Sequence, residues 1–533
     1  MNTFRLPILA AMFAASFAFA FSGGDGSASN PYQISTPDHL EAVNDDLSAH
    51  YVLTNDIDLS GRTYDSAVIA PDTDYSDNGS YEPIFTGTPF SGSFDGAGYK
   101  ILNLTVDTSD LTDDNIGYLS LLGKIDGGDV RNLGVENVQI IGGNDSGGLG
   151  GLCGYNEEGT IENCYATGSV SGDKRVGGLC GYNGGTITNC FAEGSVSGDE
   201  RLGGLCGDND GGTIENCYAT GSVSGDDYLG GLCGDNDGGT IENCYATGSV
   251  SGDDYLGGLC GYNDHGTITN CYATSDVSGN NNSYRLGGLC GINLGGTIQN
   301  CYSTGSVSGG NDSYYLGGLC GKIEGGKITN CYATGSVSGD GYLGGLCGYN
   351  RDATIENCYA TGSVSGGDDA DYLGGFCGEN SGTIKHCYST SWVGAGNNSH
   401  GGFCGRKIYS TESECFWDIE TSMMDIGYGK INGLDGTDDI YWILLNMEEF
   451  PGVRGKTTAQ MQDINTFLDA GWDFAGESAN GDEDIWVMQE NGYPKLAGNA
   501  GSTTGSNPAD MNEDGIVDIL DFAVFSENWL IAE

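Results

Sequence analysis

The end of the chain carries oxygen-bearing side chains at the spacing of a calcium-binding loop. Calcium prefers oxygen ligands, and in such a loop they come from positions 1, 3, 5, 7, 9 and 12. Here the predicted ligands are the side chains of Asp510, Asn512, Asp514, Asp518 and Asp521 and the backbone carbonyl of Ile516. Gly515 stands at position 6, where the loop turns sharply. Position 12 holds Asp in place of the usual Glu. The sequence predicts calcium as a cofactor here.

A second set of reactive residues is the twenty cysteines, which form ten pairs whose partners are 10 or 11 positions apart. In the divergent repeat at 117–140, Leu122 and Leu133 replace both members of a pair, so both positions are expected to face inward. One disulfide per repeat is predicted, and buried free thiols are the alternative. Metal binding is less expected, because no CxxC spacing occurs. The pairs are Cys153 and Cys164, Cys180 and Cys190, Cys206 and Cys217, Cys233 and Cys244, Cys260 and Cys271, Cys290 and Cys301, Cys320 and Cys331, Cys347 and Cys358, Cys377 and Cys387, and Cys404 and Cys415.

The cysteine pairs lie in a repeated phrase, seen at 229–251 as LGGLCGDNDGGTIENCYATGSVS, whose copies start 26, 27 or 30 residues apart. A fixed period of this length is typical of a solenoid. Each copy has short β-prone stretches separated by Gly, Asn and Asp, which turn the chain. Stacked copies bury a common face and form parallel sheets along the axis. Equivalent side chains then form ladders. We expect an asparagine ladder that begins at Asn163 and an aromatic ladder from Tyr165 to Phe416.

The rest of the chain divides around this array. We predict a signal peptide at 1–20, an N-terminal cap at 21–48 and divergent β-helix coils at 49–146. Ten cysteine-paired repeats follow at 147–417, then a C-terminal cap region at 418–498. A linker at 499–508 leads to the calcium motif at 509–533. The caps contain helical patterns, one of which starts after Thr36 with Pro37 at its first position.

Charge and targeting signals limit the possible functions. The chain has 19 basic and 74 acidic residues, a formal net charge of -55, which repels nucleic acid and anionic membranes. Arg5 precedes an apolar run that ends at a small-x-small signal, Ala18-Phe19-Ala20, as in secretory signal peptides. The mature protein is therefore predicted to be secreted or at the cell surface, with no membrane span. An oxidising destination would permit disulfides.

The phrases GGLCGYNGGTITNC and YATGSVSG resemble the GLUG repeat of bacterial secreted and surface proteins, including regions of IgA-specific metalloendopeptidases. The resemblance covers roughly 117–417 and implies an all-β fold, a right-handed parallel β-helix with small α-containing caps. The protease chemistry is not implied, because His39, His50, His265, His386 and His400 form no HExxH pair.

The tail resembles one half of a type I dockerin, the module that docks cellulases onto cohesin scaffolds. The loop is followed by an amphipathic segment with Leu520, Phe522, Phe525 and Trp529. A complete dockerin has two such units and this chain has one, which argues against a cohesin partner. We expect a binding or adhesion rod for carbohydrate or a surface protein, with no identifiable catalytic site. The alternative is a polysaccharide-degrading enzyme or an accessory subunit of a carbohydrate-degrading complex.

Overall fold

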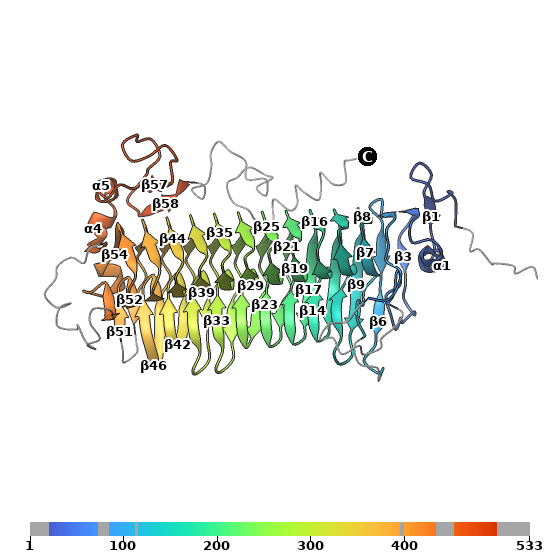
Figure 1. The fold of residues 1–533 in the computed structure, drawn as a ribbon, viewed down its shortest axis with the longest axis horizontal. Helices are drawn as coiled ribbons and strands as arrows, with labels where there is room; N and C mark the ends of the chain where they lie inside the picture. The colour runs from blue at the N-terminus through green and yellow to red at the C-terminus, as the bar shows by residue number, and fades with distance from the viewer. Residues whose placement is uncertain (1–20, 73–84, 112–115, 395–398, 433–451, 498–533) are drawn as a thin grey trace, which may run out of the picture.

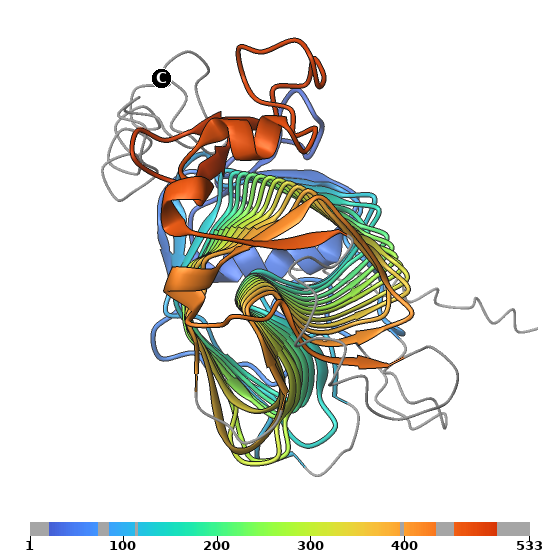
Figure 2. The ribbon, with the colours of Figure 1, turned by 90° about the vertical axis from the view of Figure 1, so that its left-hand side faces the viewer.

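The computed structural model describes residues 21–72, 85–111, 116–394, 399–432 and 452–497. These residues form a rod of stacked coils whose strands run across its long axis (Figure 1). Viewed along that axis, the coils lie over one another with a bent cross-section (Figure 2). The predicted parallel β-solenoid is confirmed, and its right-handed sense stays a prediction.

Three parallel sheets run along the described part of the rod. A 12-stranded sheet carries the first cysteine of every pair. Its strands are β7 (Leu122–Asp126), β11 (Cys153–Glu157), β15 (Cys180–Asn183), β19 (Cys206–Asp210), β24 (Cys233–Asp237), β29 (Cys260–Asp264), β34 (Cys290–Leu294), β39 (Cys320–Glu324), β43 (Cys347–Arg351), β47 (Cys377–Asn380), β52 (Cys404–Ile408) and β55 (Tyr428–Asn432).

A 14-stranded sheet is built from the Thr-Ile stretches of the repeat. Its strands are β1 (Tyr32–Ile34), β2 (His50–Leu53), β4 (Ser93–Asp95), β8 (Asp129–Arg131), β12 (Thr160–Glu162), β16 (Thr186–Thr188), β20 (Thr213–Glu215), β25 (Thr240–Glu242), β30 (Thr267–Thr269), β35 (Thr297–Gln299), β40 (Lys327–Thr329), β44 (Thr354–Glu356), β48 (Thr383–Lys385) and β53 (Thr411–Ser413).

The third sheet has 30 short strands, because each coil crosses it in two or three pieces. They are β3 (Ile57–Asp58), β5 (Lys100–Leu102), β6 (Thr105–Asp107), β9 (Gly134–Ile141), β10 (Gly147–Gly150), β13 (Tyr165–Ser171), β14 (Lys174–Gly177), β17 (Phe191–Ser197), β18 (Glu200–Gly203), β21 (Tyr218–Ala219), β22 (Val223–Ser224), β23 (Asp227–Gly230), β26 (Tyr245–Ala246), β27 (Val250–Gly252), β28 (Asp254–Gly257), β31 (Tyr272–Ala273), β32 (Val277–Gly279), β33 (Tyr284–Gly287), β36 (Tyr302–Ser303), β37 (Val307–Ser308), β38 (Tyr314–Gly317), β41 (Tyr332–Ala333), β42 (Val337–Gly344), β45 (Tyr359–Ala360), β46 (Val364–Gly374), β49 (Tyr388–Ser389), β50 (Val393–Gly394), β51 (Ser399–Gly401), β54 (Cys415–Asp418) and β56 (Val453–Lys456).

The Gly-Gly pair before each first cysteine is required by close backbone contacts, one within the coil and one with the next coil. A Cβ on Gly230 would lie 1.8 Å from the carbonyl oxygen of Cys233, and one on Gly231 would lie 2.1 Å from that of Gly258. The residue before each second cysteine lies in the left-handed region, and it is Asn in the eight coils from Asn163 to Asn357, as at Asn243 with φ 53°. Asn tolerates this conformation better than most residues. These requirements explain why the phrase recurs with so little change.

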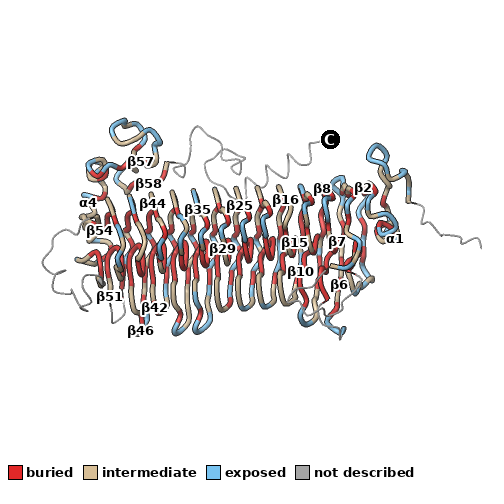
Figure 3. Tube along the Cα trace, viewed as in Figure 1, coloured by how far each residue is buried: buried red, intermediate tan, exposed pale blue. Residues whose placement is uncertain are grey.

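Inside the rod, Leu, Ile, Val, Ala and Cys side chains of successive coils form one continuous core. Buried positions recur at the same places in every coil (Figure 3). Leu152 and Cys153 are adjacent, yet both are 0% exposed. The amides of both residues donate to the carbonyl of Leu179, at 3.0 and 3.1 Å, a two-against-one pairing like that of a β-bulge. This irregularity at the corner turns two neighbouring side chains inward.

The ends carry the predicted helices. The helix α1 (Pro37–Glu41) has Thr36 as its N-cap and continues as a 3₁₀ turn, η1 (Ala42–Asp45). After the last coils come α2 (Ile419–Ser422), α4 (Thr458–Met461) and α5 (Ile464–Leu468), with an antiparallel pair, β57 (Trp486–Met488) and β58 (Pro494–Leu496). Residues 458–496 lie against the side of the rod in both ribbon views. No helix in the described part of the chain has the length and apolar character to cross a bilayer.

Candidate binding seam and the cysteine ladders

The predicted calcium ligands, Asp510, Asn512, Asp514, Ile516, Asp518 and Asp521, lie outside the described residues, as does the predicted signal peptide. Calcium binding therefore stays a prediction. Within the described ranges, no group of three or more His, Cys, Asp or Glu side chains is arranged to hold a metal ion.

The cysteines form two ladders along the rod, and all twenty are buried free thiols. The first ladder stacks in register from Cys153 to Cys404, and the second runs from Cys164 to Cys415. Each thiol has its nearest thiol neighbours in the coils above and below, not in its own coil. The prediction of one disulfide per coil is therefore not supported, and the structure contains the alternative, buried thiols.

The second ladder also takes part in hydrogen bonds between coils. From Cys164 to Cys358, each cysteine N–H donates to the Sγ of the next ladder cysteine, at 3.3–3.4 Å. Burial raises the pKa of the Cys206 and Cys244 thiols, so the uncharged form is favoured. Leu122 and Tyr428 lie at the two ends of the first ladder. These thiols act as small core side chains.

A buried asparagine ladder, which the sequence analysis missed, runs beside the first cysteines. Asn156, Asn183, Asn209, Asn236 and Asn263 each donate from Nδ2 to the Oδ1 of the next asparagine, at 2.6–2.8 Å. All are 0% exposed. The sequence signal for this ladder is the Asn that recurs in the phrase Cys-Gly-x-Asn. The predicted ladder at the Asn163 position also exists but lies nearer the surface, with weaker contacts such as 3.2 Å between Asn270 and Asn243.

The aromatic ladder is confirmed as packing between coils. From Tyr165 to Tyr388, successive ring centroids are 4.7–5.1 Å apart and the rings are within 7° of parallel. Its last rings, Tyr359, Tyr388 and Phe416, share an apolar cluster with residues 461–496. Because each ring covers the face of its neighbour, the ladder offers ring edges to the solvent. It is therefore a poor platform for stacking sugar rings.

One strip in which the coils differ is rich in aromatic and basic residues, and we call it the seam. The first column of the seam consists of the residue that follows each Cys-Gly pair, from Tyr155 to Arg406. The second column consists of the residue that precedes Val-Gly or Leu-Gly in the coils from Arg175 to Tyr372. Nine of the eighteen residues of the seam are Tyr, and five are basic, half of the ten basic residues in 147–417. The seam consists of Tyr155, Tyr182, Asp208, Asp235, Tyr262, Ile292, Lys322, Tyr349, Glu379 and Arg406, with Arg175, Arg201, Tyr228, Tyr255, Arg285, Tyr315, Tyr342 and Tyr372.

The two columns touch, as the ionic contacts near the N-terminal end of the seam show. Arg175 Nε lies 2.9 Å from Asp208 Oδ2. Arg201 bridges two coils, with NH1 3.5 Å from Asp208 Oδ2 and Nε 3.2 Å from Asp235 Oδ2. Asp208 and Asp235 pair in register on β19 and β24. The two arginines therefore lie within ion-pair distance of two stacked carboxyl groups.

Asp235 is a strongly perturbed carboxyl group of the seam. It is 7% exposed, and its Oδ1 has no hydrogen-bond partner among the described residues. Burial and the neighbouring Asp208 raise the pKa of Asp235 to about 8, against the opposing effect of Arg201. At neutral pH the protonated form is therefore substantially populated.

Further along, the seam is aromatic. Tyr228 and Tyr255 stack with centroids 4.5 Å apart, and Tyr262 meets both edge-on at 5.4 and 5.7 Å. Tyr315 stacks on Tyr349 at 5.4 Å. All five rings are partly exposed. A surface rich in Tyr and Arg has the composition of binding interfaces.

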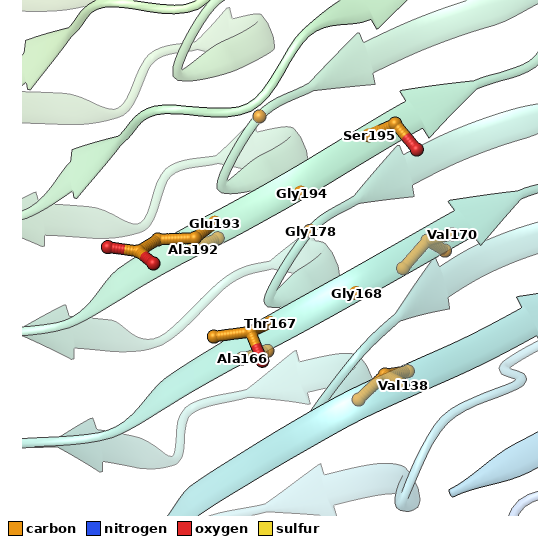
Figure 4. Close-up of a pocket in the computed structure, with 11 residues that line it drawn as sticks. Val138, Ala166, Thr167, Gly168, Val170, Gly178, Ala192, Glu193, Gly194 and Ser195 are labelled. Carbon is orange, nitrogen blue, oxygen red and sulfur yellow. The ribbon is translucent and has the colours of Figure 1, made fainter. Parts of the chain in front are cut away.

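A small hollow lies between β9, β13 and β17 (Figure 4). Its lining is mostly Gly, Ala and Val, with polar side chains only from Thr167, Glu193 and Ser195. It has room for about one water molecule. One carboxyl group and two hydroxyl groups make no recognisable catalytic set, so the hollow is a gap in coil packing.

The fold and the repeated phrase together define a parallel β-solenoid. The family model described as the GLUG motif matches residues 145–171, 172–197, 198–224, 225–251, 252–278, 282–308, 312–338 and 339–365. Its segments coincide with successive coils of the structure.

Two proteins align with part of this chain. Halomucin from Haloquadratum walsbyi is 36% identical over 166 residues, 30% of this chain and 2% of its own length. A protein named as a Gly-rich membrane protein, from Evansella cellulosilytica, is 35% identical over 149 residues, 27% of this chain and 15% of its own length. This chain thus matches only a small part of either relative. A solved structure named as an immunoglobulin A1 protease from Bacteroides ovatus aligns with 90% of this chain and 95% of its own at 18% identity and a TM-score of 0.21.

Proposed function

We propose that this chain is an extracellular adhesion or binding rod that holds a polysaccharide along the seam. The observation that carries the proposal is the contrast within the repeat. Most positions are fixed by coil packing, while the varying positions of the seam hold nine tyrosines and half of the basic residues of 147–417. Aromatic and Arg side chains are the residues that most often dominate binding energies. The GLUG repeats and the name of the relative described as a membrane protein support a place at the cell surface.

A retention assay with a polysaccharide panel tests this function. Retention should depend on seam residues such as Tyr349, which packs on Tyr315 and Tyr342. We expect Tyr349→Ala to weaken retention on the order of tenfold, because an aromatic contact of the seam is lost. Tyr409→Ala is the matched control, since Tyr409 is 80% exposed and off the seam. If no polysaccharide is retained and a purified surface protein is, the rod binds protein instead.

Polysaccharide degradation is the second candidate, favoured by the stacked carboxyl groups of Asp208 and Asp235. Paired carboxyl groups, one of them protonated, carry out glycoside hydrolysis. Both groups are less than 10% exposed and both contact Arg201, which fits an ion cluster better than an open active site. Reducing ends measured in the same retention assay separate the two functions. Release of reducing ends that Asp235→Asn abolishes would establish degradation.

We also propose that residues 510–521 bind one calcium ion, which would order a short module for anchoring or sorting the protein. The support is the donor spacing in the sequence. Isothermal titration should show one site in the full chain that Asp510→Ala and Asp514→Ala each abolish. A wild-type chain that gives no calcium heat would refute the assignment.

A further inference from the structure

Arg285 differs from the other basic residues of the seam because no carboxylate neutralises it. Arg175 and Arg201 contact Asp208, Lys322 contacts Glu324 at 2.6 Å, and Arg406 contacts Glu379 at 3.1 Å. Among the described residues, Arg285 makes no ion pair within 4.0 Å and no hydrogen bond from its guanidinium. The first-column residue in the same coil as Arg285 is Ile292, whose side chain has no hydrogen-bond acceptor.

The guanidinium is nevertheless held in place. Its central carbon lies 4.5 Å from the centroid of the Tyr255 ring, a cation–π contact. Nε is buried, while the side chain as a whole is partly exposed. Tyr228 lies on the other side of Tyr255, so aromatic stacking continues along the seam up to Arg285. A guanidinium fixed by stacking presents its planar set of donors at low entropic cost.

The carboxylates that feel the charge of Arg285 are already engaged by other groups. The charge of Arg285 acts on Asp254 and Glu324 without a direct ion pair. Asp254 already accepts the N–H of Tyr284 at 2.6 Å. Glu324 already contacts Lys322 at 2.6 Å and Arg351 at 3.1 Å. Both carboxylates are thus engaged by other groups, and the donors of the Arg285 guanidinium have no acceptor among the described residues.

We propose that Arg285, stacked on Tyr255, binds an anionic group, a carboxylate or a sulfate ester, of an acidic polysaccharide lying along the seam. A planar guanidinium matches the oxygen pairs of both groups and can bind them through two parallel hydrogen bonds. An extended polymer suits this place because the stacked rings of Tyr228 and Tyr255 continue along the seam from Arg285. The inference rests on the proposed polysaccharide function and specifies its ligand.

The inference is tested by measuring how tightly the full-length protein binds three defined polymers. The measurement is made at about 0.15 M salt, where the interaction between charges more than about 8 Å apart is largely screened. The polymers are polygalacturonate, its methyl-esterified form, which has the same backbone without the charge, and a sulfated galactan. We expect one of the two anionic polymers to bind on the order of tenfold more tightly than the neutral ester. The stronger of the two identifies the group, carboxylate or sulfate.

Variants then assign the preference to Arg285. Arg285→Ala should remove the preference for the anionic polymer, and Arg285→Lys should restore part of it, because Lys keeps the charge but lacks the two-pronged donor set. Arg131→Ala, which removes an exposed cation paired with Asp95 outside the seam, should change nothing. Circular dichroism confirms that each variant is folded.

Two outcomes would overturn the inference. If the methyl ester binds as tightly as polygalacturonate and the sulfated galactan, or if Arg285→Ala binds like the wild type, Arg285 is not the anchor. Retention that still depends on Tyr349 would then leave the proposed function intact. If none of the polymers in this test or the wider panel is retained, the inference and the proposed function fail together.

Discussion

At the scale of single residues, Asp235 couples the stability of the rod to pH. An unfolded Asp has a pKa near 3.9, while the folded state raises the pKa of Asp235 to about 8. Between these values the folded protein holds a proton that the unfolded chain has released. The free energy of unfolding should therefore fall as pH rises from about 4 to about 8.

Asp235→Asn should remove this contribution, because the amide has nearly the same shape and does not ionise. Urea midpoints from pH 5 to pH 8 should decline less steeply in the variant than in the wild type. Asp237→Asn, at an exposed position of the same strand, should follow the wild-type slope. Parallel curves for Asp235→Asn and the wild type would contradict the raised pKa.

Asn236 provides a second test at this scale. Its Nδ2 donates to Asn263 at 2.7 Å and to the carbonyl of Gly239 at 3.1 Å, and its Oδ1 accepts from Asn209. Asn236→Ala leaves buried partners unsatisfied, so we expect a loss of about 2 kcal/mol in the free energy of unfolding. A denaturant titration measures this loss. Thr247→Ala, at an exposed position, is the control and should leave the free energy of unfolding nearly unchanged. A loss as small as that of Thr247→Ala would show that the ladder contributes little.

At the scale of elements, the cysteine ladders predict a clear chemical result. Native protein should show almost no reaction with a water-soluble thiol reagent, because every Sγ is buried. The same reagent in denaturant without reductant should count twenty thiols. A lower count would reveal disulfides, and peptide mapping would then show whether they join cysteines of one coil or of neighbouring coils.

The C-terminal segment gives a second test of element packing. Trp472 is 0% exposed, lies 5.8 Å from Phe416 and 4.7 Å from Trp486, and donates from Nε1 to the carbonyl of Glu414 at 3.0 Å. Trp472→Ala should cost about 3–5 kcal/mol, enough to release a segment of this size. Limited proteolysis should then cut between 457 and 497 while the β-sheet circular dichroism persists. The exposed Met423→Ala is the control, and equal protease resistance in both variants would contradict the packing.

How much of the fold and of the seam could be predicted from the sequence depends on the kind of contact. The period, the cap at Thr36 and Pro37 and the aromatic ladder follow from local patterns. The partner of each cysteine does not, because sequence spacing pairs Cys233 with Cys244, whereas stacking places Cys233 between Cys206 and Cys260. The seam could not be predicted either, since its two columns are separated by a corner of the coil and meet only in three dimensions.

At the scale of the whole molecule, the rod should behave as a sum of coils. Each coil contacts only its neighbours, so stability adds up from local interfaces. The 12 strands of one sheet at about 4.8 Å spacing give a rod on the order of 50 Å between the ends.

Removing whole coils should therefore shorten the rod without unfolding it. Deletion of 198–278, three matched repeats, joins equivalent positions and should reduce the maximum dimension in small-angle scattering by about 14 Å. Deletion of 198–237 removes one and a half coils and should abolish folding, because the three sheets lose their alignment. Equal behaviour of the two deletions would contradict the additive rod.

The coil interface also bears on how such a chain can change over generations. Residues 203–229 and 230–256 are identical in sequence, and their coils stack through the same residues. Unequal recombination between two such segments adds or removes a complete coil and leaves every remaining interface intact. Point substitutions in the seam, by contrast, alter the exposed surface of one coil and leave the length of the rod unchanged. The length of the rod and its ligand preference can therefore change independently during evolution.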